Sequence, residues 1–173
     1  MTRRTATLLT NEIILEGLQP LIVPLDWIKP MEGNPRRGKV EAIARSVRRF
    51  GQRTPIVVRK TGEEDGHPVG YAVKGNHTRQ AMVEKLKWTY AAVVWVDEDE
   101  QTASAYSLAD NRSHDLGSYD EDAMAAMVLT LRNVPDLLDD AGFDARALER
   151  LARNTTPGAL DRAAGGGETF TGD

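Results

Sequence analysis

The stretch Lys74-Gly75-Asn76-His77-Thr78-Arg79-Gln80-Ala81-Met82 joins a strand-like run at residues 71–73 to a helix-like run at residues 79–87. Glycine at such a junction lets the backbone turn sharply and approach a ligand closely. Asparagine and threonine are helix-capping residue types, so the first N–H groups of the helix are expected to point outward without partners. The stretch therefore predicts a strand, a tight turn and a helix, with the turn open to a ligand.

Cationic or protonatable side chains surround this turn, at the positive end of the predicted helix dipole. They are Lys74, His77 and Arg79. Backbone N–H groups and positive charge at a helix start favour an anion, and phosphate is the usual one. Glycine and asparagine also occupy many strand-to-helix turns for structural reasons alone. These residues by themselves leave a phosphate site and a plain turn both open.

Length and composition narrow the class of protein. A chain of 173 residues can bury one sizeable core and still carry tails. Cysteine is absent, which excludes a disulfide framework, a zinc–thiolate site and a cysteine nucleophile and suits the cytoplasm, where we expect the protein. No apolar run approaches the length of a membrane span, and the N-terminus lacks the apolar core of a secretory signal. A net charge of −4 argues against a protein that simply coats nucleic acid.

Charge is nevertheless unevenly distributed along the chain. Between residues 36 and 60 the only acid is Glu41, whereas the bases are Arg36, Arg37, Lys39, Arg45, Arg48, Arg49, Arg53, Arg59 and Lys60. Between residues 97 and 150 acids outnumber bases. This separation indicates either a half that faces a polyanion or two solvated faces that balance each other. On the first interpretation, DNA is contacted by Arg36, Arg37, Arg45, Arg48 and Arg49.

Apolar patterning predicts an α+β domain followed by a helical appendage. Apolar and β-branched runs predict strands at residues 21–28, 54–59, 71–73 and 91–96. Helical spacing predicts helices at residues 38–50, 79–87, 97–109, 120–131, 135–141 and 145–153. Residues 62–68 are interpreted as a polar hairpin loop and residues 110–116 as a polar interruption. We therefore expect an N-terminal arm (1–20), a small mixed sheet flanked by helices (21–116), a helical subdomain (117–153) and a disordered tail (154–173).

The same patterning assigns individual side chains to core or surface. Trp27, Trp88 and Trp95 are expected in the core rather than as platforms for base stacking, and His67 at the surface of the hairpin loop. The buried face of the helix at residues 120–131 is expected to consist of Ala123, Met124, Met127, Val128 and Leu131.

Three blocks of this sequence, in this order, resemble the N-terminal domain of the ParB family, which shares its fold with sulfiredoxin. The first is Gly51-Gln52-Arg53-Thr54-Pro55-Ile56-Val57-Val58-Arg59, the second Gly75-Asn76-His77-Thr78-Arg79-Gln80-Ala81, and the third Asp110-Asn111-Arg112-Ser113-His114-Asp115-Leu116. Asn34-Pro35-Arg36 is similar to a further family motif before the first helix. The likeness spans residues 23–116.

The resemblance implies a nucleoside triphosphate, CTP in the best-known branch, with a divalent metal. In that branch the nucleotide drives closure of a DNA clamp and is slowly hydrolysed. Asp110 and Asn111 would hold Mg²⁺, which prefers oxygen ligands. Arg36 and Arg53 would reach other phosphate oxygens or DNA, and Gln52 would line the base pocket. Contacts to the nucleotide are thus predicted for Gln52, Arg53, Lys74, Gly75, Asn76, His77, Thr78, Arg79 and Arg112.

Departures from the family pattern lie in the second block. Asn76 replaces a glutamate, His77 and Thr78 replace two arginines, and Gln80 replaces the last arginine of the motif. The block loses cationic charge, so the base stays open between CTP and ATP. The cysteine of sulfiredoxin is missing, which removes that activity.

Alternatives remain for single residues of these blocks. His77 is a candidate phosphate contact and a candidate catalytic acid or base, or else it caps a helix or packs on Trp88 or Tyr90. His114 either joins the metal or lies at the surface. Asn111 and Arg112 either belong to the site or cap the turn between two helices.

Three functions follow as hypotheses. The first is a switch or slow triphosphatase in a DNA transaction, with nucleotide and DNA as partners and a homodimer left open. The second is a metal-dependent nuclease that uses Asp110 and Asn111 with His77 or His114. The third is a non-catalytic adaptor that docks a DNA-modifying enzyme through its acidic helices.

Overall fold

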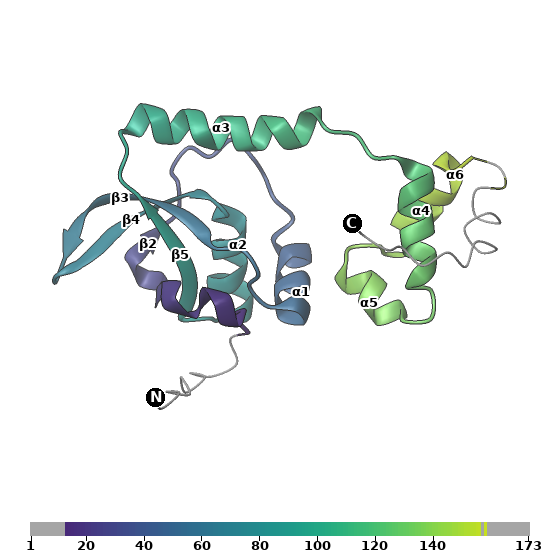
Figure 1. The fold of residues 1–173 in the computed structure, drawn as a ribbon, viewed down its shortest axis with the longest axis horizontal. Coiled ribbons are helices and arrows are strands. Elements are labelled where there is room, and N and C mark those ends of the chain that lie inside the picture. The colour runs from purple at the N-terminus through teal and green to yellow at the C-terminus, as the bar shows by residue number, and fades with distance from the viewer. Residues whose placement is uncertain (1–12, 157, 159–173) are drawn as a thin grey trace. The chain divides into compact units, whose positions relative to one another are not determined.

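The computed structural model of the chain describes residues 13–156 and 158, in two compact units that divide between Asp115 and Leu116 (Figure 1). Most of the predicted arm (residues 1–20) and of the predicted tail (154–173) lies outside the described residues. Within the first unit the chain begins with a 3₁₀ helix, η1 (Glu16–Leu21).

The described residues of the first unit form a five-stranded mixed sheet with the strand order β1-β5-β3-β4-β2. The strands are β1 (Ile22–Pro24), β2 (Ile28–Lys29), β3 (Ile56–Glu64), β4 (His67–Lys74) and β5 (Tyr90–Val96). β3 and β4 form an antiparallel hairpin, whereas β5 runs parallel to β3. The predicted α+β class with a small mixed sheet and a helical C-terminal part is confirmed.

The predicted strand at residues 21–28 is wrong as a single element. β1 ends at Pro24, a 3₁₀ turn η2 (Leu25–Trp27) follows, and β2 then pairs with β4 at the opposite edge of the sheet. Proline cannot donate to a strand ladder, which explains why the strand stops there. The N–H group of Leu25 instead bonds to the carbonyl oxygen of Thr89 at 2.8 Å.

The predicted polar loop at residues 62–68 is also wrong, because both strands continue almost to the turn. Only Asp65 and Gly66 lie between β3 and β4, and both have positive φ, 49° and 80°. Two such residues make the tight turn whose twist suits a hairpin. His67, predicted as a surface side chain, is half-buried and stacks on Trp27 with ring centroids 3.9 Å apart.

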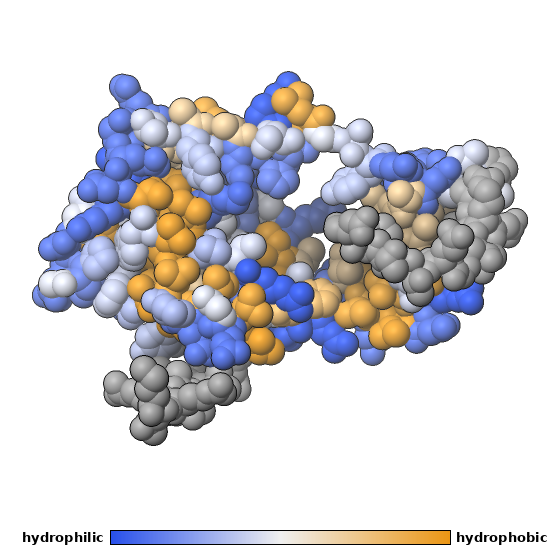
Figure 2. Space-filling view, viewed as in Figure 1, coloured by the Kyte–Doolittle hydropathy of each residue, from blue (hydrophilic) through white to orange (hydrophobic). Residues whose placement is uncertain are grey.

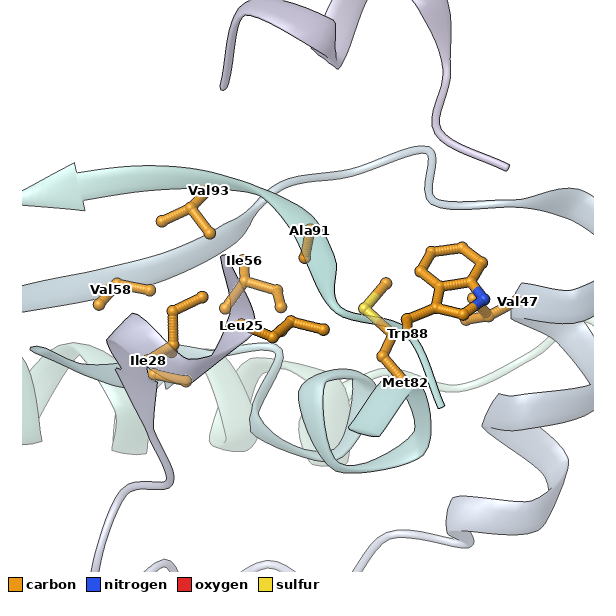
Figure 3. Packing of buried hydrophobic residues seen from close by; sticks show 10 residues of the cluster. Leu25, Ile28, Val47, Ile56, Val58, Met82, Trp88, Ala91 and Val93 are labelled. Atoms are coloured by element: carbon orange, nitrogen blue, oxygen red, sulfur yellow. The ribbon is translucent and has the colours of Figure 1, made fainter. Parts of the chain in front are cut away.

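Helix α1 (Val40–Phe50) confirms the helix predicted at residues 38–50, and Gly51, with φ 73°, ends it. Val47 of this helix joins the hydrophobic core, which is drawn in Figure 3 and contains Leu25, Ile28, Val47, Ile56, Val58, Ala72, Met82, Trp88, Ala91 and Val93. Each large side chain that is fully buried there contributes about 1.5–3 kcal/mol. Trp88 is in this core as predicted, and Trp95 packs against it partly buried.

The helix predicted at residues 79–87 begins earlier and changes its winding. Helix α2 (Asn76–Gln80) continues directly into a π-helical turn, η3 (Ala81–Leu86), which Lys87 ends with φ 57°. After β5 comes α3 (Glu100–Leu116).

The polar interruption predicted at residues 110–116 is wrong, because α3 continues through it to Leu116. Polar residues do not break a helix when their side chains reach solvent or neighbouring groups. Here the hydroxyl of Ser113 donates to the carbonyl oxygen of Asp110 at 3.0 Å, and Nδ1 of His114 lies 2.7 Å from the same oxygen.

The second unit contains α4 (Glu121–Thr130), α5 (Pro135–Asp140) and α6 (Ala145–Asn154). The buried face predicted for residues 120–131 is partly wrong, since Ala123 is exposed and Met127 is 72% exposed, whereas Ala125 is buried. Side chains of Asp120 and Asp144 cap α4 and α6 by accepting bonds from Ala123 and Ala147 N–H groups.

The surface of the first unit carries hydrophobic residues over its strands. Figure 2 shows hydrophobic residues over the strands on the visible face of the first unit, with hydrophilic residues around them. Ile22 of β1 and Val94 of β5 are among the large hydrophobic side chains of this unit that are exposed. Across the described residues, none of the helices combines the length and the apolar character that a membrane span requires.

Candidate anion-binding site

A cleft of about 350 Å³ opens in the first unit between the β4–α2 turn, the loop before α1 and helix α3. All three sequence blocks contribute to it, the first through Thr54 to Ile56, the second through the turn and the third through one face of α3. The cleft is lined by Asn34, Arg36, Ile43, Thr54, Pro55, Ile56, Val73, Lys74, Gly75, Asn76, His77, Thr78, Ser107, Asp110, Asn111 and His114.

Gly75 makes the turn from β4 into α2 in the left-handed conformation, with φ 83° and ψ 21°. Any other residue would be strained at this position. Its carbonyl oxygen accepts the N–H group of Arg79 at 2.9 Å and so starts the helix. The turn thus brings the backbone of residues 75–78 to the cleft wall.

His77 ties the loop before α1 to this turn. Its Nε2 accepts the N–H group of Gly38 at 3.0 Å, so the ring carries its proton on Nδ1 when neutral. A Cβ atom at Gly38 would lie 2.6 Å from Cγ of His77, which explains why the loop carries glycine there. Nδ1 is left as the ring donor for an anion in the cleft.

Asn76 holds the same loop from a second point. Its Oδ1 accepts the N–H group of Met31 at 3.3 Å. Two neighbouring side chains of α2 therefore position the loop that carries Arg36, another residue of the cleft.

Cationic side chains bridge the cleft to α3. Nζ of Lys74 lies 2.6 Å from Oδ1 of Asp110, and this hydrogen bond raises the pKa of Lys74. Arg36 donates through Nη1 to Oδ1 of Asn111 at 3.3 Å, and the same nitrogen lies 3.8 Å from Oδ1 of Asp115. The two residues predicted as metal ligands face the cleft, and a cationic side chain contacts one side-chain oxygen of each, Oδ1 of Asp110 and Oδ1 of Asn111.

With Lys74 on Asp110 and Arg36 on Asn111, this donor set is not one that holds Mg²⁺ without the phosphates of a nucleotide. Among the described residues, Asp110 contributes the one carboxylate that lines the cleft, and the described residues contain no group of three His, Asp or Glu side chains that could hold a metal ion. A divalent ion placed about 4 Å from the Lys74 ammonium would be repelled by about 2 kcal/mol in bulk water and by more near a protein surface.

Several residues predicted for the nucleotide site do not line this cleft, although Arg53 lines the second hollow beside it. Arg79 is half-buried and donates through Nε to the carbonyl oxygen of Ile28 at 2.6 Å, and burial lowers its pKa. Arg53 bonds to the carbonyl oxygen of Phe50 and lies over its ring. Arg112 is exposed and is not among the residues that line the cleft.

Gln52, predicted to line a base pocket, lies in the wall of a second hollow beside the cleft, and its side-chain amide also has a structural role. It is 2% exposed, and its amide accepts the N–H group of Ala92 at 2.7 Å and donates to the Ala92 carbonyl at 2.8 Å. Its second amide hydrogen goes to the carbonyl oxygen of Thr54. Both donors are used, so the side chain fixes the approach to β3 against β5 rather than presenting an amide to a base.

The arginines predicted to contact DNA differ in their exposure and in their surroundings. Arg37, Arg48 and Arg49 are exposed, and Arg36 belongs to the cleft. Arg45 is half-buried, and its Nε atom is buried without a hydrogen-bond partner among the described residues. It therefore does not extend an exposed stripe formed by the other two arginines of α1.

A second hollow adjoins the cleft and shares Ile43, Thr54 and Thr78 with it. Its volume is about 500 Å³, and its lining combines apolar side chains, among them Val47 and Phe50, with polar or charged ones, among them Gln52 and Arg53. The pair of hollows offers a charged end and an end lined in part by apolar side chains.

Ser107 and Asn34 were missed as cleft residues by sequence reasoning. Ser107 is 5% exposed and lies on the face of α3 that also carries residues 110, 111 and 114. These positions follow the i, i+3, i+4, i+7 spacing of one helix face, so a continuous helix would have predicted the grouping.

Comparisons with known proteins place this fold. No protein-family model matches the chain. A nucleoid occlusion protein of Lysinibacillus sphaericus (strain C3-41) is 29% identical to this chain over 117 residues. The match covers 65% of this chain and 38% of that protein, so the chain spans well under half the length of this relative. The C-terminally truncated chromosome-partitioning protein ParB of Caulobacter crescentus, complexed with CTP-γ-S, superposes with a TM-score of 0.52 at 14% identity, over 82% of this chain and 74% of that one.

Proposed function

Since the chain contains a ParB-like domain, we propose that it binds a nucleoside triphosphate in the cleft between the Gly75 turn and α3 and acts as a nucleotide-dependent switch in a DNA transaction. The observation that carries this proposal is the convergence of three separated sequence blocks on one polar cleft with Lys74, Arg36 and His77 at its walls. Cationic groups and ring N–H donors are the partners that phosphate oxygens require.

The neighbouring hollow, whose lining includes Val47 and Phe50, supports a place for the base and sugar. It joins the charged cleft through shared residues, as a site for a molecule with an anionic and a flat apolar end would. CTP is the first nucleotide to test, because the ParB protein with a similar fold was obtained with a CTP analogue. ATP remains the alternative.

The switch follows from how Arg36 is held in the described structure. Its contacts with Asn111 and Asp115 connect the loop before α1 to α3. A phosphate group competes for the same guanidinium through charge-assisted hydrogen bonds. Binding would therefore draw Arg36 away from α3 and change how the loop is held, which makes α3 sensitive to the occupancy of the cleft.

Hydrolysis of the bound nucleotide would depend on His77. Because Nε2 already accepts the Gly38 N–H group, Nδ1 is the ring atom that can exchange a proton with a phosphate or a water. The nuclease hypothesis has less support, since two-metal nucleases assemble several carboxylates and the cleft offers Asp110.

Isothermal titration calorimetry with CTP, ATP, GTP and UTP, each with and without MgCl2, tests the proposal. Binding of at least one triphosphate is expected, and Arg36→Ala is expected to weaken it by about tenfold or more. Lys85→Ala is the matched control, because Lys85 is also a surface lysine paired with an acid, Glu41, but is not among the cleft residues. Absence of heat with all four nucleotides in both conditions refutes the proposal and favours the adaptor hypothesis.

A further inference from the structure

The ammonium group of Lys74 lies 2.6 Å from Oδ1 of Asp110, the carboxylate predicted to bind a metal ion. We propose, on the premise of the proposed function, that Lys74 is the resident counter-cation of the cleft and replaces a divalent metal, so that triphosphate binding by this chain is independent of Mg²⁺. Lys74 neutralises Asp110 in the empty cleft and bridges Asp110 to a phosphate group in the occupied one.

The geometry of the ion pair supports the first role of Lys74, which is to neutralise Asp110. The Lys74–Asp110 pair spans from the last residue of β4 to α3, with 2.6 Å between Nζ and Oδ1. The carboxylate is the less exposed partner, at 21% of its side chain against 44% for the lysine. Lys74 is therefore the close cationic partner of this partly exposed carboxylate.

The number of N–H donors on Lys74 supports its second role, which is to bridge Asp110 to a phosphate group. An ammonium group has three N–H donors, and Asp110 uses one of them in the contact described. Lys74 itself lines the cleft, so the remaining donors can reach an anion there without release of Asp110. A single group then contacts carboxylate and phosphate together, which is the arrangement that a bridging metal would otherwise provide.

Arg36 covers the neighbouring ligand position until a phosphate group draws it away from α3. Its guanidinium holds Oδ1 of Asn111, the other oxygen predicted to bind metal. Lys74 and Arg36 together carry two positive charges, the same formal charge as one divalent ion. The anion site is therefore furnished by side chains of the chain itself.

Calorimetric titrations of CTP and ATP in MgCl2 and in EDTA test this proposal. Wild-type affinity is expected to agree between the two conditions within about threefold. Lys74→Ala is expected to weaken binding in EDTA by about tenfold or more, and to regain part of it with MgCl2 because Asp110 becomes open to the metal. Lys74→Arg keeps the charge and is expected to bind in EDTA, and Lys85→Ala is the control that leaves both titrations unchanged.

A second readout needs no nucleotide. Mn²⁺ added to the ¹⁵N-labelled, ligand-free chain is expected to broaden the amide signals around Asp110 selectively in Lys74→Ala and not in the wild type. Selective broadening in the wild type at the same Mn²⁺ concentration overturns the proposal, because the carboxylate would then be open to a metal with Lys74 present.

The two failures are distinguishable. A wild-type chain that binds CTP or ATP in MgCl2 and loses that binding in EDTA refutes the role of Lys74 and leaves the nucleotide function intact. A chain that binds no triphosphate in either condition refutes the nucleotide function, and the proposal with it. Thermal melts of Lys74→Ala and Lys74→Arg before titration show that lost affinity is not lost folding.

Discussion

Substitution of Gly38 by alanine tests whether His77 positions the loop that carries Arg36. The added Cβ would lie 2.6 Å from Cγ and 2.9 Å from Cδ2 and Nδ1 of His77, so the ring or the loop must move. The φ angle of Gly38 lies outside the left-handed region, and alanine can therefore adopt this backbone. The three atoms nearest to the added Cβ all belong to His77, so we expect the effect to come mainly from this contact.

The size of the effect can be worked from three contributions. Forced repacking costs about 1–3 kcal/mol, and loss of the Gly38 N–H bond to Nε2 costs about 1 kcal/mol. Replacing glycine stabilises by about 0.4–1 kcal/mol through the unfolded chain. We expect a net destabilisation of about 2 kcal/mol, most of which disappears when His77 is alanine.

Urea unfolding followed by tryptophan fluorescence measures this change in the first unit, because Trp27, Trp88 and Trp95 all lie there. The assay compares Gly38→Ala, His77→Ala and the double variant. Gly62→Ala is the control, since a Cβ there meets nothing within 4 Å. The reasoning is refuted if Gly38→Ala stabilises the protein, or if the two substitutions are additive in the double variant.

Three further predictions concern stability. Gln52→Ala is expected to destabilise the first unit by about 3 kcal/mol in the same assay, because three hydrogen bonds to the backbone are lost; a cost below about 1 kcal/mol contradicts the structural role. Met127→Lys is expected to change the free energy of unfolding of the helical unit by no more than about 0.5 kcal/mol, measured by thermal melting. A clear loss of stability would show that the Met127 side chain is buried. Because the pKa of Lys74 is raised, its ion pair with Asp110 contributes fully to stability below pH 10.5 and is lost as the pH rises through the raised pKa. The wild type should therefore lose stability relative to Lys74→Gln only above pH 10.5. A stability difference that stays constant through the alkaline range contradicts this.

The parts of the fold that were predictable from sequence carry local signals. Helix α1 has apolar residues at helical spacing and a terminal glycine, and β5 is a continuous apolar run, so both were found. The β3–β4 hairpin was placed correctly, although its strands were drawn too short. Polar residues on an exposed two-stranded ribbon resemble a loop in sequence, which explains that error.

Other features depended on tertiary partners that a sequence does not display. The break between β1 and β2 follows from pairing at opposite edges of the sheet. Residues 110–116 resemble a turn by composition, yet their side chains bond within α3 and across to Lys74 and Arg36. Gln52 and Arg79 were placed at the site by their motifs, but neighbouring carbonyl groups hold both side chains.

We propose that the cleft beside the Gly75 turn receives the phosphates of a nucleoside triphosphate. Backbone amide chemical-shift mapping of the ¹⁵N-labelled chain during titration with CTP, and then with ATP, locates the residues that the nucleotide contacts. The largest shifts are expected at residues 36–38, 74–78 and 107–114, with smaller shifts in the helices of the second unit. Shifts confined to other residues, or an unchanged spectrum with both nucleotides, would contradict it.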